Sequence, residues 1–155
     1  MEYLLDRGNG GIAFVMNEGW SGRNMVLELM EETCRMVLRR RRPDVEPLVF
    51  ARAVDVNAEV LLHEGITGVF CCDDVSAIQV MGRLTEQGVS VPGQMRLASY
   101  GNTDLARYFT PAITSVDPHN DEMVSRLVEI LTDGEEVPGQ VRQHVVQPDL
   151  VIRET

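Results

Sequence analysis

The apolar residues of this chain follow two alternating patterns, and the alternation restricts the folds that it can adopt. Short continuous apolar runs are typical of strands buried on both faces. We expect strands at residues 12–16, 48–51, 66–72, 96–100 and 113–116, and a last extended segment at 142–152. Longer segments with helical spacing lie between them, at 24–39, 56–63, 75–88 and 120–132. This order predicts an α/β fold, a Rossmann-like three-layer sandwich with a mostly parallel sheet.

In such a sheet, ligands bind at the carboxyl ends of the strands. The loops that follow the first four strands are residues 16–23, 52–55, 72–74 and 101–104. The only tryptophan, Trp20, lies in the first of these loops between glycines. Its ring can stack on a sugar or a purine, or it can pack over the edge of the domain.

Composition excludes several classes of protein. Hydrophobic residues make up 44% of the chain, yet no apolar run approaches the roughly 20 residues of a membrane span. The first residues lack the basic start and apolar stretch of a signal peptide, so we expect a cytoplasmic protein. The net charge of −10 repels phosphate backbones, so the chain alone is not expected to bind DNA. Three cysteines without metal-ligand spacing are expected to be buried apolar residues.

The pair Asp73-Asp74 follows a strand and opens a helix. Its simplest interpretation is a helix cap, in which a carboxylate accepts free backbone N–H groups. A response-regulator receiver also uses paired carboxylates, but after the first strand, where this chain has Asn17-Glu18. Ser21 and His63 have no partners for a catalytic triad. The sequence therefore predicts no catalytic residue, no metal site, no cofactor and no enzyme activity.

Four segments, in order, resemble one protein family. Residues 68–77, GVFCCDDVSA, are similar to the family pattern a-V-F-C-x-N-D-x-x-A, and residues 88–97 to G-x-x-V-P-x-D-v-s-v. Residues 104–116, DLARYFTPAITSV, are similar to p-L-A-R-Y-x-T-P-x-L-T-T-V, and residues 147–153 to l-x-P-x-L-V-x-R. The chain is identified on these motifs as similar to the effector-sensing domain of LacI/GalR-type transcription regulators.

The resemblance implies one lobe of a type I periplasmic-binding-protein-like fold, in which two lobes close on a sugar or purine. Residues 1–155 would be the C-terminal portion of the effector-binding domain. Residues 8–116 would form its C-terminal lobe, and 117–155 the hinge crossing, a helix and the final strand. Family members are homodimers and bind DNA through an N-terminal helix-turn-helix domain, which we expect this chain to lack. A sugar-binding protein of a transport system would share the fold but would carry a signal peptide.

The resemblance also implies which residues lie nearest the ligand. These are expected to be Trp20, Arg23, Asp73, Gly101 and Asn102. Where the family commonly has a ligand-binding aspartate, this chain has Gly101, with Asn102 beside it as a partial replacement. We therefore expect weak binding of hexoses, which Gly101→Asp should strengthen. The helix at 120–132 has an apolar face, which is expected to form a homodimer or to fold back onto its own lobe.

Overall fold

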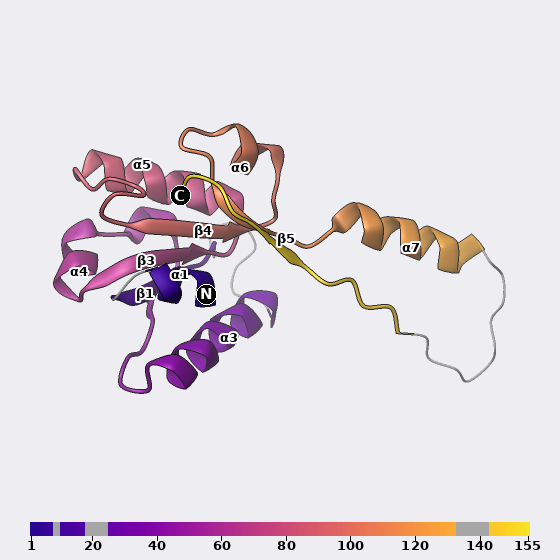
Figure 1. Cartoon of the computed structure of the whole chain (residues 1–155), viewed down its shortest axis with the longest axis horizontal. Coiled ribbons are helices and arrows are strands. Elements are labelled where there is room, and N and C mark those ends of the chain that lie inside the picture. Colours follow the sequence, from indigo (N-terminus) through magenta and orange to yellow (C-terminus); the bar gives the residue numbers. More distant parts are fainter. Residues whose placement is uncertain (8–9, 18–24, 133–142) are drawn as a thin grey trace.

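The computed structural model describes residues 1–7, 10–17, 25–132 and 143–155 (Figure 1). Its centre is a six-stranded sheet in the order β2-β1-β3-β4-β5-β6. The first five strands are parallel, and β6 pairs antiparallel with β5. The strands are β1 (Gly11–Val15), β2 (Leu48–Phe50), β3 (Ile66–Cys71), β4 (Arg96–Tyr100), β5 (Thr114–Asp117) and β6 (Asp149–Val151). The predicted α/β fold with a mostly parallel sheet is confirmed.

Helices cover both faces of the sheet, because successive strand residues point to opposite sides. Ala13 and Val15 belong to the core under α4 and α5, whereas Ile12 and Phe14 belong to the core under α1 and α3. The helical elements are α1 (Glu2–Arg7), α3 (Met25–Arg41), η1 (Ala53–Asp55), α4 (Ala58–His63), α5 (Asp74–Glu86), α6 (Asp104–Tyr108) and α7 (Asn120–Thr132). The sheet thus lies between two layers of helices, with one hydrophobic core on each of its faces, and this gives the three predicted layers.

Local chemistry explains where the elements differ from the sequence expectation. The expected helix at 56–63 divides into η1 and α4, because the Asn57 side chain accepts the N–H groups of Glu59 and Val60 and so starts a new helix. Helix α6 was not predicted, since five residues are too few to show helical spacing. All three cysteines are free and buried, as expected.

Helix α7 lies apart from the layered body (Figure 1). None of its residues is buried, and its large apolar side chains are exposed. The alternative in which this helix folds back onto its own lobe is therefore not the arrangement found here. Among the helices that the structure describes, none is both long and apolar enough to cross a bilayer.

Candidate functional site

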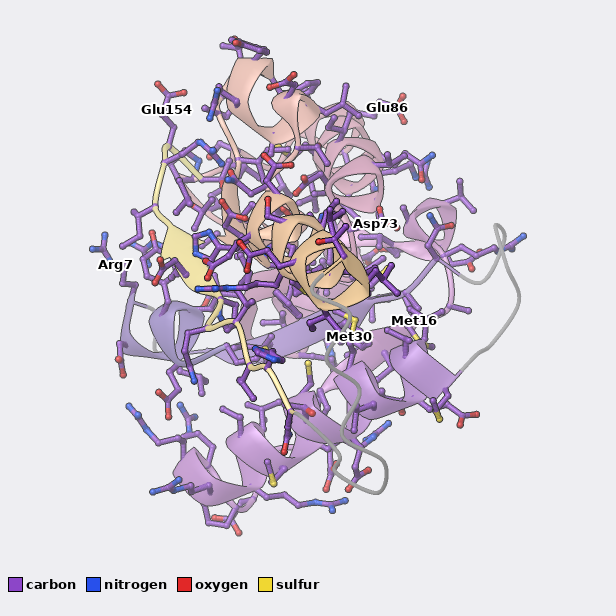
Figure 2. The ribbon with its side chains drawn as sticks, turned by 90° about the vertical axis from the view of Figure 1, so that its right-hand side faces the viewer. Arg7, Met16, Met30, Asp73, Glu86 and Glu154 are labelled. Atoms are coloured by element: carbon purple, nitrogen blue, oxygen red, sulfur yellow. The ribbon has the colours of Figure 1, made fainter. Side chains whose placement is uncertain are left out.

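The strand order has a switch point between β1 and β3. From β1 the chain moves to β2 on one side, and it then returns to β3 on the other side of β1. Ligands of open α/β sheets bind at such a switch point, outside the carboxyl ends of the strands. Asn17 follows β1 and Asp73 follows β3, and the Asn17 side-chain N–H donates to the Asp73 carboxylate over 3.0 Å. Figure 2 views the molecule from this side, with Met16 and Asp73 labelled.

Asp73 caps α5, as the sequence predicts. Its Oδ1 accepts the backbone N–H of Ser76 at 2.6 Å, and its Oδ2 accepts from Asn17. Burial acts to raise the pKa of Asp73, but these hydrogen bonds outweigh burial and hold the pKa below its usual value. The site therefore carries a fixed negative charge at neutral pH.

Asp74, the next residue, is turned inward and is 2% exposed. Its Oδ1 accepts from the hydroxyls of Ser99 on β4 and Ser115 on β5, the latter at 2.7 Å. Its Oδ2 accepts the backbone N–H of Thr103 at 2.7 Å and the Thr103 hydroxyl at 2.8 Å. One carboxylate thus joins α5, β4, β5 and the start of α6 at the carboxyl end of the sheet. This role of Asp74 was not predicted from the sequence; Ser99 and Ser115, polar residues within two core strands, were the available signal.

Gly101 lies beside this carboxylate with a φ of +130°, a backbone conformation that glycine adopts far more easily than other residues. A Cβ at this position would lie 3.2 Å from Asp74 Oδ2. The effect of Gly101→Asp on hexose binding stays a prediction. In this backbone conformation the new side chain would be strained, and its carboxylate would start beside another carboxylate.

Asn102 also differs from the expectation. Its side chain donates to Asp117 Oδ2 at 2.7 Å, and its oxygen accepts from the Arg153 guanidinium. It therefore links β5 to the segment after β6 and does not border the cavity beside Asp73. The structure brings Asp73 and Gly101 together, while Trp20 and Arg23 lie outside the described residues.

A cavity of about 640 Å³ lies at this edge of the sheet. It is lined by Asn17, Cys72, Asp73, Asp74, Val75, Gln79, Tyr100, Gly101, Thr103 and Leu105. Its size and its mixture of apolar walls with a few polar groups suit a small organic ligand. Burial raises the pKa of the Cys72 thiol to about 12, so this sulfur is not a nucleophile at neutral pH. Within the described residues, no cluster of acidic, histidine and cysteine side chains could hold a metal ion.

Sequence relatives include bacterial repressors. The transcriptional repressor PurR of Vibrio parahaemolyticus is 28% identical over 165 residues, which cover 99% of this chain and 48% of the relative. PurR of Vibrio campbellii is 32% identical over 162 residues, with the same coverage of 99% and 48%. The chain thus spans about half the length of the curated relatives that it matches.

Solved structures with the same fold lead to the same group. A putative LacI-family regulator from Sanguibacter keddieii has a TM-score of 0.76 and 26% identity, over 99% of this chain and 60% of that protein. The regulator CcpA of Lactococcus lactis has a TM-score of 0.73 and 24% identity, over 97% and 57%. The protein-family model for the periplasmic binding protein-like domain matches residues 1–155. The chain belongs to this family, in the form found in LacI-type transcription regulators.

Proposed function

We propose that this chain is an effector-sensing module of a LacI/GalR-type regulator and that it binds a sugar-like or purine-like molecule. The observation that carries the proposal is the cavity at the carboxyl ends of β1, β3 and β4, with Asp73 among its lining residues. The module would work in the cytoplasm, without cofactor or enzyme activity. Residues 117–155 would include the hinge crossing toward a second lobe, so that ligand binding changes the geometry of the lobes.

The groups nearest the ligand would come from several elements. Asp73 and Gly101 border the cavity, and Trp20 and Arg23 belong to the chain segment that follows β1. Two proteins with this fold support the ligand class: one from Alkaliphilus metalliredigens is complexed with D-xylulofuranose, and the regulator CelR is complexed with cellobiose. Since Gly101 supplies no side chain and Asn102 is bonded elsewhere, hexoses would bind weakly.

Calorimetric titration tests the proposal with ribose, galactose, hypoxanthine and guanosine. We expect measurable binding of at least one compound and a loss of at least tenfold in affinity in Leu105→Trp, because the larger ring fills the cavity. The matched control is Val60→Trp on α4, an exposed apolar residue away from the cavity, which should leave the affinity unchanged. Equal affinity in Leu105→Trp and the parent chain would contradict the assigned site. Tight galactose binding in the parent chain would contradict the expected specificity.

We further propose that this chain reaches DNA only through a helix-turn-helix domain that is not part of it. The net charge of −10 supports this, because a protein gains affinity for DNA by neutralising phosphates with cations. In a mobility-shift assay, the purified chain should not retard duplex DNA at micromolar concentration. A salt-sensitive, submicromolar shift would refute the proposal.

A further inference from the structure

His119 lies where two segments beside the sheet meet. One leaves β5 and enters α7, and the other, residues 143–148, leads into β6 (Figure 1). The His119 carbonyl accepts the N–H of Met123, so this residue caps α7. Its own N–H donates to Asp117 Oδ1 at 2.8 Å, and its φ of +55° makes the turn between β5 and the helix. The backbone of His119 therefore sets the direction in which α7 leaves the sheet.

The imidazole of His119 spans the two connecting segments. Its Nε2 lies 3.0 Å from Asp149 Oδ2, at the first residue of β6. Its Nδ1 lies 3.9 Å from Asp117 Oδ2, at the last residue of β5. Asp117 and Asp149 are partners in the antiparallel ladder, so the ring bridges the paired ends of these two strands.

Most of the charged groups around the ring are carboxylates. The charged groups that face the same hollow are Asp104 and Arg107 of α6, Asp117 of β5, and Asp121 and Glu122 of α7, with Asp149 of β6 in direct contact with the ring. Arg153, beyond β6, acts on Asp117. The positive groups are Arg107 and Arg153, together with the positive end of the α7 dipole. The carboxylates outnumber them, and two lie against the ring.

Asp117 is held in its charged form near this ring. The N–H of His119 and the side chain of Asn102 both donate to it, and these hydrogen bonds lower the pKa of Asp117. A charged Asp117 is present throughout the range in which imidazoles ordinarily titrate, around pH 6.5. Asp117 therefore offers the ring a fixed negative charge.

We propose that His119, Asp117 and Asp149 form a proton-operated clamp, which ties the connection between β5 and α7 to the start of β6. A protonated ring donates to Asp149 and attracts Asp117 at the same time. A neutral ring has a single N–H, so it keeps at most one of these interactions and loses the attraction of its charge for both carboxylates. The clamp thus holds while the ring is protonated and loosens when the ring loses its proton. This inference does not depend on the identity of an effector.

Distance measurements between spin labels test the clamp. Labels are attached at Ser125→Cys on α7 and Glu59→Cys on α4, both exposed positions. The native cysteines should stay unlabelled because they are buried, and burial raises the pKa of Cys34 to about 12. The labelled chain is diluted in an excess of unlabelled chain, so that only distances within one chain are read. We then expect one narrow distance distribution at pH 5 and a broader one at pH 8. The ratio of clamped to unclamped populations should fall roughly two- to fivefold, the range expected for a partly exposed ion pair.

Three variants show whether the pH dependence comes from His119 and its contact with Asp149. His119→Asn retains a residue that tolerates the left-handed backbone but does not titrate, and it should give the same broad distribution at both pH values. Asp149→Asn, at a side chain that is 77% exposed, should weaken the pH dependence without disturbing the fold. The control His63→Gln, on α4, should retain the full pH dependence. Identical distributions at both pH values in the parent, or a full pH dependence in His119→Asn, Asp149→Asn or both, would overturn the clamp.

Discussion

Two adjacent aspartates have different tasks because their side chains point in different directions. Asp73 remains at the rim of the cavity and caps α5, while Asp74 lies under it and accepts hydrogen bonds from three other segments. A buried carboxylate is tolerated only when such donors replace the water that it loses. The donors, in turn, depend on Asp74 and would be unsatisfied without it.

The substitution Asp74→Asn should therefore be costly. The amide keeps the size of the carboxylate but replaces one acceptor with an N–H₂ group that faces donors, so we expect unfolding to become easier by roughly 3 kcal/mol. Urea denaturation followed by circular dichroism measures this. Asp104→Asn, an exposed position in the first turn of α6, is the control and should change stability by less than about 0.5 kcal/mol. An equally small effect at Asp74 would show that its hydrogen bonds contribute little to stability.

Residue 101 favours glycine for two reasons: its backbone has a positive φ, and the Asp74 carboxylate lies close to where a Cβ would be. Gly101→Ala places a Cβ at 3.2 Å from Asp74 Oδ2 and forces alanine to a φ of +130°. We expect a loss of about 1–3 kcal/mol in thermal or urea unfolding. Gly82→Ala is the matched control: this glycine lies within α5 with no atom near its added methyl group, so helix propensity predicts a gain of about 0.5–1 kcal/mol. Opposite signs for the two variants are the result expected, and a stabilising Gly101→Ala would contradict it.

The sequence predicted part of this site and could not predict the rest. A carboxylate directly after a strand and before a helix is a local pattern, and it identified Asp73 as a cap. The role of Asp74 depends on Ser99 and Ser115, which reach it only through the register of β4 and β5. The direction of the Asn102 side chain likewise depends on Asp117 and Arg153, which lie 15 and 51 residues away along the chain.

At the scale of elements, the carboxyl-terminal segment is held by its last residue as well as by the β6 ladder. Thr155 is buried, and its hydroxyl accepts the N–H of Thr114 at 2.9 Å and donates to the carbonyl of Leu97 at 2.8 Å. Its own carbonyl accepts the Thr114 hydroxyl at 2.9 Å. These bonds attach the segment after β6 to the start of β5 and, beyond it, to β4.

Thr155→Val should loosen this attachment. The substitution keeps the shape but leaves the N–H of Thr114 and the carbonyl of Leu97 without their partner, which costs about 1–3 kcal/mol. Hydrogen exchange should then become faster at Leu150 and Val151 than in the parent chain. Thr132→Val, at the exposed end of α7, serves as control and should leave exchange in β6 unchanged. Unaltered exchange in β6 after Thr155→Val would mean that the ladder alone holds the strand.

Helices and strands were predictable from the sequence where a run or a periodic spacing of apolar residues extended over most of the element. The continuous runs at β1, β3 and β4 and the spacing of α5 and α7 gave their positions closely, because burial on the sheet dictates both patterns. The short elements were not predictable in this way. Helix α6 depends on its contacts at the start of the helix with the Asp74 carboxylate, and the break between η1 and α4 depends on one asparagine side chain.

At the scale of the whole molecule, the body and α7 have different surfaces. The body buries apolar side chains on both faces of the sheet, whereas α7 buries none. Its exposed apolar side chains are Met123, Val124, Leu127, Val128, Ile130 and Leu131. Six such side chains on one short helix are unusual for a surface that faces only water, because burial of each contributes roughly 1.5–3 kcal/mol.

We therefore predict that the chain forms a homodimer in which α7 is covered. Light scattering at micromolar concentration should give about twice the monomer mass of 17.3 kDa. Leu127→Glu should shift the equilibrium toward the monomer, because Leu127 is 55% exposed in the single chain and a charge would have to be buried in the interface. Val60→Glu, on α4, places the same charge on the layered body and should leave the dimer intact. A monomer whose Leu127 remains accessible to solvent would contradict the prediction, because the apolar face of α7 would then be stable in water without a partner.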